Sequence, residues 1–336
     1  MDKHEKTEVL HLVTAGDANF KDGICVTVVS AVANLRKDCQ VFVHILDGGV
    51  GASTQQRLEK ACQSIHPVCT VCFHALEKSK FKFFTPGPGG SLMFYARLAI
   101  AEIFPDLDKI LYIDSDTLVL GDLYELWGLD VGIKTAYACP DRKVTFLGSD
   151  CPWKLEEKEA DTPYFNSGVM LINLAAWRSI ELFRNSVELV KDQNIAPKWW
   201  DQTILNYLLR GSVEFLPESW NWQRNFYSGK NHQIQLIHFS TRKKPWTYWG
   251  FADQFILWRQ CYKKHFGSPI LIFLKKGSFE GLIQGLWDAF SESNLFFRMI
   301  RKWKIQADLA LNKNPQKDRE LRLSLEFYSN PQRPNE

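Results

Sequence analysis

The chain has 336 residues, of which 45% are apolar and 24% charged, an ordinary globular composition that excludes a disordered or fibrous protein. Its formal net charge of +3 is too small to indicate a nucleic-acid-binding protein. No window approaches the ~18 to 20 consecutive apolar residues of a membrane-spanning helix, and the charged stretch at 1–10 lacks the apolar core of a secretory signal.

Strand and helix patterns alternate through the first part of the chain. Strands are predicted at 8–14, 40–46, 68–76 and 109–113, and helices at 22–35, 53–62 and 91–104. This alternation predicts an α/β fold in which helices cover both faces of a parallel sheet. Ligands of such sheets bind at the carboxyl ends of the strands, so the residues that follow each strand are candidates for function.

The later part of the chain is less regular. Residues 140–163 are polar and contain proline, so we expect a loop there. A strand is predicted at 167–174 and a helix at 201–210, and beyond Gly250 the chain becomes mostly helical and basic. From Arg259 to the end there are 14 Lys/Arg against 8 Asp/Glu, so this segment holds the whole positive excess.

The eight cysteines are not spaced as in a small disulfide framework. Cys69 and Cys72 form a CxxC pair, but no second pair has similar spacing, so a metal or redox role is the weaker interpretation. We therefore expect reduced thiols in a cytoplasmic protein.

Asp114 and Asp116 follow the strand predicted at 109–113 and are separated only by Ser115. Two carboxylates this close repel each other, and burial makes their ionised forms less stable still. A divalent cation such as Mn²⁺, which prefers oxygen ligands and tolerates an imidazole, would remove the repulsion and leave positions for diphosphate oxygens. The pattern favours a metal–diphosphate clamp, and the alternative is a solvated turn.

A strand followed by DxDx(T/V) also occurs in haloacid-dehalogenase-like phosphatases, where the first aspartate is the nucleophile. That chemistry needs a Ser/Thr, a Lys and a further acidic pair downstream, and the nearest candidate segment, 147–151, offers only Asp150. The motif also comes after more than a hundred residues here, whereas that family usually begins with it. A metal-dependent phosphatase is therefore the alternative function, and a sugar-nucleotide-binding protein without activity is a third.

Five blocks occur in order along the chain: TAGDANF (14–20), YARLAIAEIFPDLDKILYIDSDTLVLGDLYELW (95–127), YFNSGVMLINLAAWR (164–178), DQTILN (201–206) and HFSTRKKPW (238–246). Together they resemble the retaining glycosyltransferases of family 8, especially bacterial lipopolysaccharide galactosyl- and glucosyltransferases. The resemblance implies a GT-A-like nucleotide-diphospho-sugar transferase fold, with a mixed, mostly parallel sheet flanked by helices. It also implies that galactose or glucose moves from a UDP-sugar to a saccharide or lipid-linked saccharide acceptor, with retained anomeric configuration.

The resemblance assigns Asp114, Asp116 and His238 to a metal, Mn²⁺ with Mg²⁺ as a possible substitute. It assigns Lys244 to the donor diphosphate, where a positive charge stabilises the leaving group. The neighbouring Lys243 and Arg242 leave the choice of basic residue open. Thr241 departs from the family pattern, which usually has glycine at this position, and its Cβ could crowd the diphosphate.

The first block matches the nucleotide-binding positions of the family. Asp17 and Asn19 would contact the base and ribose, and Ala15 would approach through its backbone. Phe20 stands where the family often has tyrosine, so stacking on uracil can survive while a hydroxyl contact is lost. Ser115, between the two aspartates, is also expected to contact the nucleotide-sugar.

Four residues would form the donor-sugar pocket: Arg97, Asn166, Asp201 and Gln202. Each has a structural alternative or a limit on its chemistry. Arg97 could form an ion pair that holds its helix, Asn166 could cap a turn, and Asp201 could be an N-cap. Gln202 would lie opposite the leaving group, but an amide is a poor nucleophile, so front-face attack is favoured over a double displacement.

The chain is expected to divide into a nucleotide-sugar-binding catalytic domain at 1–250, a helical basic extension at 251–312 and a polar, partly disordered tail at 313–336. Residues 294–306 combine apolar side chains with four cations and suggest either a packed helix or a helix on an anionic membrane surface. The second alternative would make the enzyme a peripheral protein on the inner face of the cytoplasmic membrane.

Overall fold

The computed structural model describes residues 9–87, 90–193, 197–223, 234–249 and 253–269, together with Ile272 and Ile283. These residues belong to two compact units. The larger unit contains the described residues up to 223, those of 234–242, and Cys261–Gly267, and the smaller contains those of 243–260 and from 268 onward. The segments at 294–306 and 313–336 lie outside the described residues, so the predicted membrane helix, tail and domain boundaries stay predictions.

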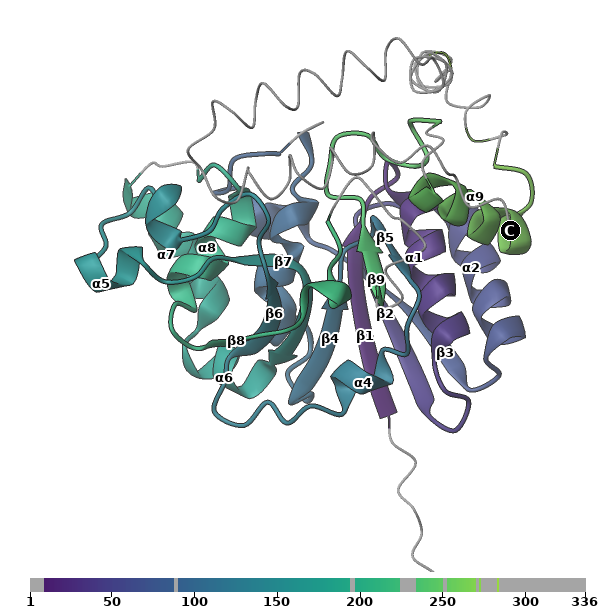
Figure 1. The fold of residues 1–336 in the computed structure, drawn as a ribbon, viewed down its shortest axis with the longest axis horizontal. Coiled ribbons are helices and arrows are strands. Elements are labelled where there is room, and N and C mark those ends of the chain that lie inside the picture. Colours follow the sequence, from purple (N-terminus) through teal and green to yellow (C-terminus); the bar gives the residue numbers. More distant parts are fainter. Residues whose placement is uncertain are drawn as a thin grey trace, which may run out of the picture. The chain divides into compact units, whose positions relative to one another are not determined.

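A seven-stranded sheet in the order β3-β2-β1-β4-β7-β6-β8 organises the larger unit (Figure 1). Its strands are β1 Val9–Gly16, β2 Gln40–Asp47, β3 Cys69–Ala75, β4 Lys109–Ile113, β6 Ala136–Pro140, β7 Phe165–Asn173 and β8 Val213–Phe215. β1 pairs in parallel with β2 and β4, β2 with β3, and β6 with β8. β7 is antiparallel to both of its neighbours, so the sheet is mixed and mostly parallel, as expected.

Both faces of the sheet are covered, because alternate side chains of β1 belong to different apolar clusters. Leu12 packs in a cluster with α1 (Lys21–Asn34) and α2 (Ala52–Ile65). Val13 packs in a cluster on the opposite face. The elements of that face are the 3₁₀ helix η3 (Met93–Ala99), α3 (Ile100–Ile103), α6 (Leu174–Ser179), α7 (Leu182–Gln193) and α8 (Trp200–Leu208).

Several short elements complete the described chain. β5 (Thr117–Val119) and β9 (Leu236–His238) form a separate antiparallel pair. The remaining helices are α4 Tyr124–Trp127, α5 Glu157–Ala160 and α9 Asp253–Phe266, and the remaining 3₁₀ helices are η1 Lys78–Phe81, η4 Leu147–Ser149 and η5 Glu218–Trp220. In the part of the chain that the structure describes, every helix is too short or too polar to cross a membrane.

The structure corrects two of the predicted elements. The helix expected at 91–104 is a 3₁₀ helix over Met93–Ala99 and α-helical only over Ile100–Ile103, and five consecutive side chains from Tyr95 to Ala99 are buried. Tertiary contacts on all sides, rather than one apolar face, therefore shape this segment. The loop expected at 140–163 contains η4 and α5, and its first residue ends β6, a strand that the sequence interpretation missed.

Candidate metal centre and active site

Asp114, Asp116 and His238 come together at the carboxyl end of β4, because each lies at the end or the start of a strand. Asp114 follows the last residue of β4, Asp116 precedes β5, and His238 ends β9. The β5–β9 pairing places Thr117 opposite His238, and the amide of Phe239 donates to the carbonyl of Asp116 over 2.8 Å. Strand register therefore positions the imidazole beside the aspartates, although more than a hundred residues separate them in the chain.

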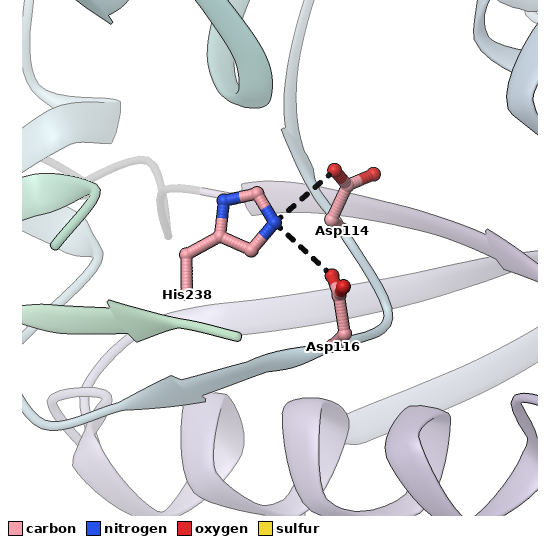
Figure 2. Close-up of side chains that lie close together, drawn as sticks. All are labelled: Asp114, Asp116 and His238. Atoms are coloured by element: carbon pink, nitrogen blue, oxygen red, sulfur yellow. Dashed lines mark ion pairs between the residues drawn. The ribbon is translucent and has the colours of Figure 1, made fainter. Parts of the chain in front are cut away.

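The three side chains converge on one point (Figure 2). Nε2 of His238 lies 3.2 Å from Oδ1 of Asp116 and 3.6 Å from Oδ2 of Asp114. One potential ligand atom from each residue lies within 4.8 Å of the other two, and Asp116 and His238 are buried. Two carboxylates and an imidazole are a suitable donor set for Mn²⁺. Among the described residues, this is the group whose arrangement fits a metal ion.

Gly168 gives the metal group its space. Its carbonyl accepts a hydrogen bond of 2.8 Å from the amide of Asp114. A Cβ at this position would lie 2.4 Å from Cε1 of His238 and 2.8 Å from Oδ2 of Asp114. Only glycine fits here without displacing the two side chains.

A hydrogen bond at Nδ1, the ring nitrogen that faces away from the two aspartates, sets the orientation of the His238 ring. Its Nδ1 lies 2.8 Å from Oδ1 of Asn221, which can only accept, so Nδ1 carries the proton. Nε2 then presents its lone pair to the carboxylates, as a metal-ligating histidine requires. Nδ2 of Asn221 in turn donates to Oδ1 of Asn166 over 2.8 Å.

Asn166 continues this network to Gln202. Nδ2 of Asn166 donates to Oε1 of Gln202 and to Oδ2 of Asp141, each over 3.0 Å. Nε2 of Gln202 donates to the same Asp141 oxygen over 3.1 Å, and the amide of Ser167 donates to Oε1 of Gln202 over 3.2 Å. A closed set of hydrogen bonds thus connects the metal group, through Asn221, to two residues predicted for the donor-sugar pocket.

Arg97 lies between two carboxylates. Its Nη2 is 2.7 Å from Oδ1 of Asp114, and its Nε is 2.9 Å from Oδ2 of Asp201. The same guanidinium donates to the carbonyl and hydroxyl of Ser167 and lies 4.6 Å from the centroid of the Tyr112 ring. The expected ion pair is therefore present, and it joins the metal group to the start of α8.

Burial and the neighbouring charges shift the pKa of Asp201 in opposite directions. Burial raises the pKa of Asp201 to about 7; Arg97 lowers it, and the charge of Asp114 raises it. The N-cap of α8 is Trp199, so the predicted N-cap role of Asp201 is wrong. Asn166 lies within β7, and its Oδ1 accepts the amide of Gly168 over 3.0 Å, a local side-chain-to-backbone contact of the kind expected for a turn cap.

The comparisons with known proteins agree with this geometry. The family model of glycosyl transferase family 8 matches residues 11–250. The chain belongs to glycosyl transferase family 8. A lipopolysaccharide 1,2-glucosyltransferase of Escherichia coli K12 is 26% identical over 260 residues, 73% of this chain and 75% of that protein. A lipopolysaccharide 1,3-galactosyltransferase of Salmonella typhimurium is 24% identical over 264 residues, 74% of this chain and 76% of that protein.

Solved structures carry the same fold. An active-site mutant of LgtC superposes with a TM-score of 0.64 at 25% identity, covering 76% of this chain and 96% of that one. The galactosyltransferase LgtC in complex with donor and acceptor sugar analogs gives the same TM-score and coverage at 24% identity. The predicted family and GT-A-like fold are confirmed, and the family favours a transferase over the phosphatase alternative.

The predicted nucleotide residues of this family-8 glycosyltransferase lie at the end of β1, beside β4. Ala15 is buried in β1. Oδ1 of Asp17 accepts the amide of Asn19 over 2.8 Å, and Oδ2 of Asp17 accepts the Ser91 hydroxyl over 3.0 Å. Phe20 is half-buried at the start of α1. Their contacts with a nucleotide stay predictions.

Two further residues predicted to contact the nucleotide-sugar, Ser115 and Lys244, lie in different parts of the structure. Ser115 is buried between the two aspartates. Lys244 belongs to the smaller unit, where its carbonyl accepts the amides of Thr247 and Tyr248 over 3.0 and 2.9 Å. Its contact with a diphosphate therefore stays a prediction.

The sequence interpretation missed Asp141 and Asn221, which complete the hydrogen-bond network between His238 and Gln202. Asp141 directly follows β6, and its Oδ1 accepts the amides of Lys143 and Val144 over 2.7 and 2.9 Å. An aspartate that directly follows an apolar stretch indicates a polar residue at a strand end, and this pattern could have identified Asp141 as it identified Asp114. Asn221 follows η5 between two tryptophans, and nothing in that pattern distinguished it.

Proposed function

We propose that this family-8 transferase moves galactose or glucose from a UDP-sugar to a saccharide acceptor, with retained anomeric configuration and with Mn²⁺. The observation that carries the proposal is the Arg97 side chain, which contacts both a predicted metal ligand, Asp114, and a predicted sugar-pocket residue, Asp201. Because Arg97 holds Asp114 and Asp201 close together, a UDP-sugar whose diphosphate is bound at the metal would have its sugar beside the start of α8.

The donor set supports a resident divalent cation. Asp114 and Asp116 supply hard oxygen atoms, and Asn221 holds His238 in the tautomer that presents Nε2 to them. When bound, such a cation would stabilise the negative charge that develops on the departing diphosphate. Lys244, if it acts as the family pattern implies, adds a second positive charge to the same leaving group.

The contacts of Gln202 favour front-face attack. Both ends of its amide are already engaged, with Asn166 and Ser167 at Oε1 and Asp141 at Nε2. An amide so held positions the sugar and is a poor nucleophile. The carboxylate of Asp201, buried one residue earlier, is suited to stabilise positive charge on the sugar ring as the donor bond breaks. The departing diphosphate can then accept the proton of the acceptor hydroxyl.

The relatives suggest the acceptor class. The two lipopolysaccharide transferases named above support a lipopolysaccharide or another glycoconjugate, and a lipid-linked saccharide would place the work on the inner face of the cytoplasmic membrane. The donor sugar follows from neither relative, since one is a glucosyltransferase and the other a galactosyltransferase.

A donor panel tests the proposal. UDP-glucose, UDP-galactose and other UDP-hexoses are incubated with Mn²⁺ and candidate saccharides, and release of UDP is measured. Chelation should abolish release and Mn²⁺ should restore it, and Asp116→Asn should lose orders of magnitude in rate. Asp122→Asn is the matched control, since Asp122 lies outside the metal group and its Oδ1 accepts the local amide of Tyr124 over 3.0 Å. Full activity after exhaustive chelation, or an inverted anomeric centre in the product, would overturn the proposal.

A further inference from the structure

The segment 76–84, LEKSKFKFF, follows β3 and exposes most of its side chains. Phe81 and Phe84 are buried, but Phe83 between them is 43% exposed. Lys78, Lys80 and Lys82 are exposed as well. An exposed aromatic side chain among three lysines is not explained by the apolar core or by the site described above.

The segment is anchored, so its exposed residues have a defined place. The ring of Phe84 stacks on Tyr95 with centroids 4.3 Å apart, and the ring of Phe81 meets Phe183 of α7 edge-on at 5.7 Å. Because Phe81 and Phe84 hold the backbone on both sides, Phe83 cannot turn inward without displacing one of them. The packing of its neighbours therefore keeps Phe83 at the surface.

Two ammonium groups border the exposed ring of Phe83. Nζ of Lys191, in the last turn of α7, lies 3.7 Å from the Phe83 centroid, and Nζ of Lys82 lies 5.1 Å from it. The acidic residue of the segment, Glu77, accepts the hydroxyl of Ser79 over 2.6 Å. We call Lys78, Lys80, Lys82, Phe83 and Lys191 the Phe83 patch.

An aromatic ring bordered by flexible ammonium groups suits a soft anionic surface. The ring can enter the boundary between headgroups and acyl chains, while each lysine extends to a phosphate without a fixed geometry. A folded protein partner would need a matching pocket and matching carboxylates. Nucleic acid would favour a more basic chain than one of net charge +3.

The patch belongs to elements that lead to the active site. β3 and β4 run in the same direction through β2 and β1, so the segment after β3 begins at the edge of the sheet where Asp114 lies. α7 ends shortly before α8, whose second residue is Asp201. The start of α8 lies at this edge, because Arg97 contacts both Asp201 and Asp114.

We propose that the Phe83 patch docks the transferase onto an anionic lipid bilayer, with Phe83 at the interface and the lysines on headgroup phosphates. The inference rests on the proposed function in one respect: a lipid-linked acceptor makes a membrane contact near the site useful. It is independent of the basic segment at 294–306, because every residue of the patch is in the larger unit.

The test is co-sedimentation of the full chain with vesicles of zwitterionic lipid alone or with anionic phosphatidylglycerol, at low and high salt. The patch variant carries Lys82→Ser, Phe83→Ser and Lys191→Ser. The matched control carries Lys37→Ser, Lys60→Ser and Ile133→Ser, which removes equal charge and an apolar side chain that is 95% exposed. Since each basic residue near an anionic surface contributes about five-fold in affinity, the loss of the two lysines alone should weaken binding by the patch variant about 25-fold.

The control should bind anionic vesicles as the unmodified chain does, and high salt should weaken both. Equal binding by patch variant and control would overturn the inference, as would equal binding to zwitterionic vesicles. Inorganic phosphate that abolishes vesicle binding at constant ionic strength would indicate a phosphate site instead of a bilayer surface. Turnover of a soluble acceptor should be unchanged in the patch variant, so failure of the proposed transferase reaction would be seen separately from failure of vesicle binding.

Discussion

Nδ1 of His238 lies 2.8 Å from Oδ1 of Asn221, although 17 positions separate the two residues. This contact decides which ring nitrogen carries the proton and which faces Asp114 and Asp116. Since Asn221 also donates to Asn166, the tautomer of a predicted metal ligand depends on the same hydrogen bonds that position the predicted sugar pocket. Metal affinity and sugar positioning should therefore respond together when the network is cut.

Asn221→Ala should lower Mn²⁺ affinity about 10- to 100-fold, the usual effect of removing such a supporting group. The measurement is electron paramagnetic resonance titration of Mn²⁺ in the presence of UDP. Asn173→Ala is the matched control. Asn173 is also buried, but it caps α6 at the carboxyl end of β7, whereas Asn166, the partner of Asn221, lies at the other end of that strand. The control should lower stability and leave Mn²⁺ affinity intact; an unchanged affinity in Asn221→Ala would contradict the prediction.

Gly168→Ala should disrupt the metal group, since the added methyl would sit 2.4 Å from Cε1 of His238. Relief of the clash requires the imidazole or Asp114 to move, so we expect at least about ten-fold weaker Mn²⁺ binding and a loss of about 1–3 kcal/mol in the free energy of unfolding. Gly128→Ala provides the comparison, because its Cβ would meet its nearest neighbour at 3.4 Å. Equal Mn²⁺ affinity and equal stability in the two variants would show that His238 and Asp114 can move to accommodate the methyl group without loss of the metal site.

At pH 8, above the Asp201 pKa of about 7, Arg97→Met should lower the free energy of unfolding by about 3–5 kcal/mol, because it leaves the buried carboxylate of Asp201 without its cation. Urea denaturation measures the change. Adding Asp201→Asn to the same chain should recover part of the loss, since the uncompensated charge is then absent. Strictly additive effects in this double-mutant cycle would mean that the two side chains do not interact in solution.

The stability of the metal-free protein should depend on pH through Asp201. Its pKa is raised by burial from 3.8 to about 7, so the folded state holds a proton that the unfolded state releases. The stabilisation is complete below pH 3.8 and is lost as the pH rises through 7. With chelator present, the unfolding free energy of the unmodified chain minus that of Asp201→Asn should fall by about 1.4 kcal/mol per pH unit within this window. A constant difference from pH 4 to 8 would contradict the shift.

Lys244→Ala should reduce kcat more than it weakens UDP binding, because the charge of Lys244 is expected to matter most as the donor bond breaks. Turnover and calorimetric titration with UDP give the two quantities. Lys243→Ala is the comparison, since Nζ of Lys243 lies 4.4 Å from the centroid of the Tyr248 ring. Equal losses of kcat and affinity in Lys244→Ala would make it a binding residue only.

Local pattern was sufficient for much of the molecule. The apolar stretch at 109–113 predicted β4, and the abrupt change to Asp114 and Asp116 placed two carboxylates at its carboxyl end. The alternating elements before it predicted the parallel half of the sheet. The block at 238–246 added His238 as a third metal ligand through family resemblance. The strands, the helices and the position of the two aspartates follow from residues that are neighbours in the chain, where side-chain periodicity and strand ends carry the information.

By itself, then, the sequence determined the α/β class, the family and the residue types of the metal group. Only the tertiary structure decided the antiparallel position of β7, which brings Gly168 against Asp114, and the supporting roles of Asn221 and Asp141. It also decided that Arg97 contacts two carboxylates from a 3₁₀ helix. Such contacts depend on strand register and on packing between distant segments, which local propensity does not specify, because a polar residue has the same local pattern whether its partner is solvent or a buried side chain.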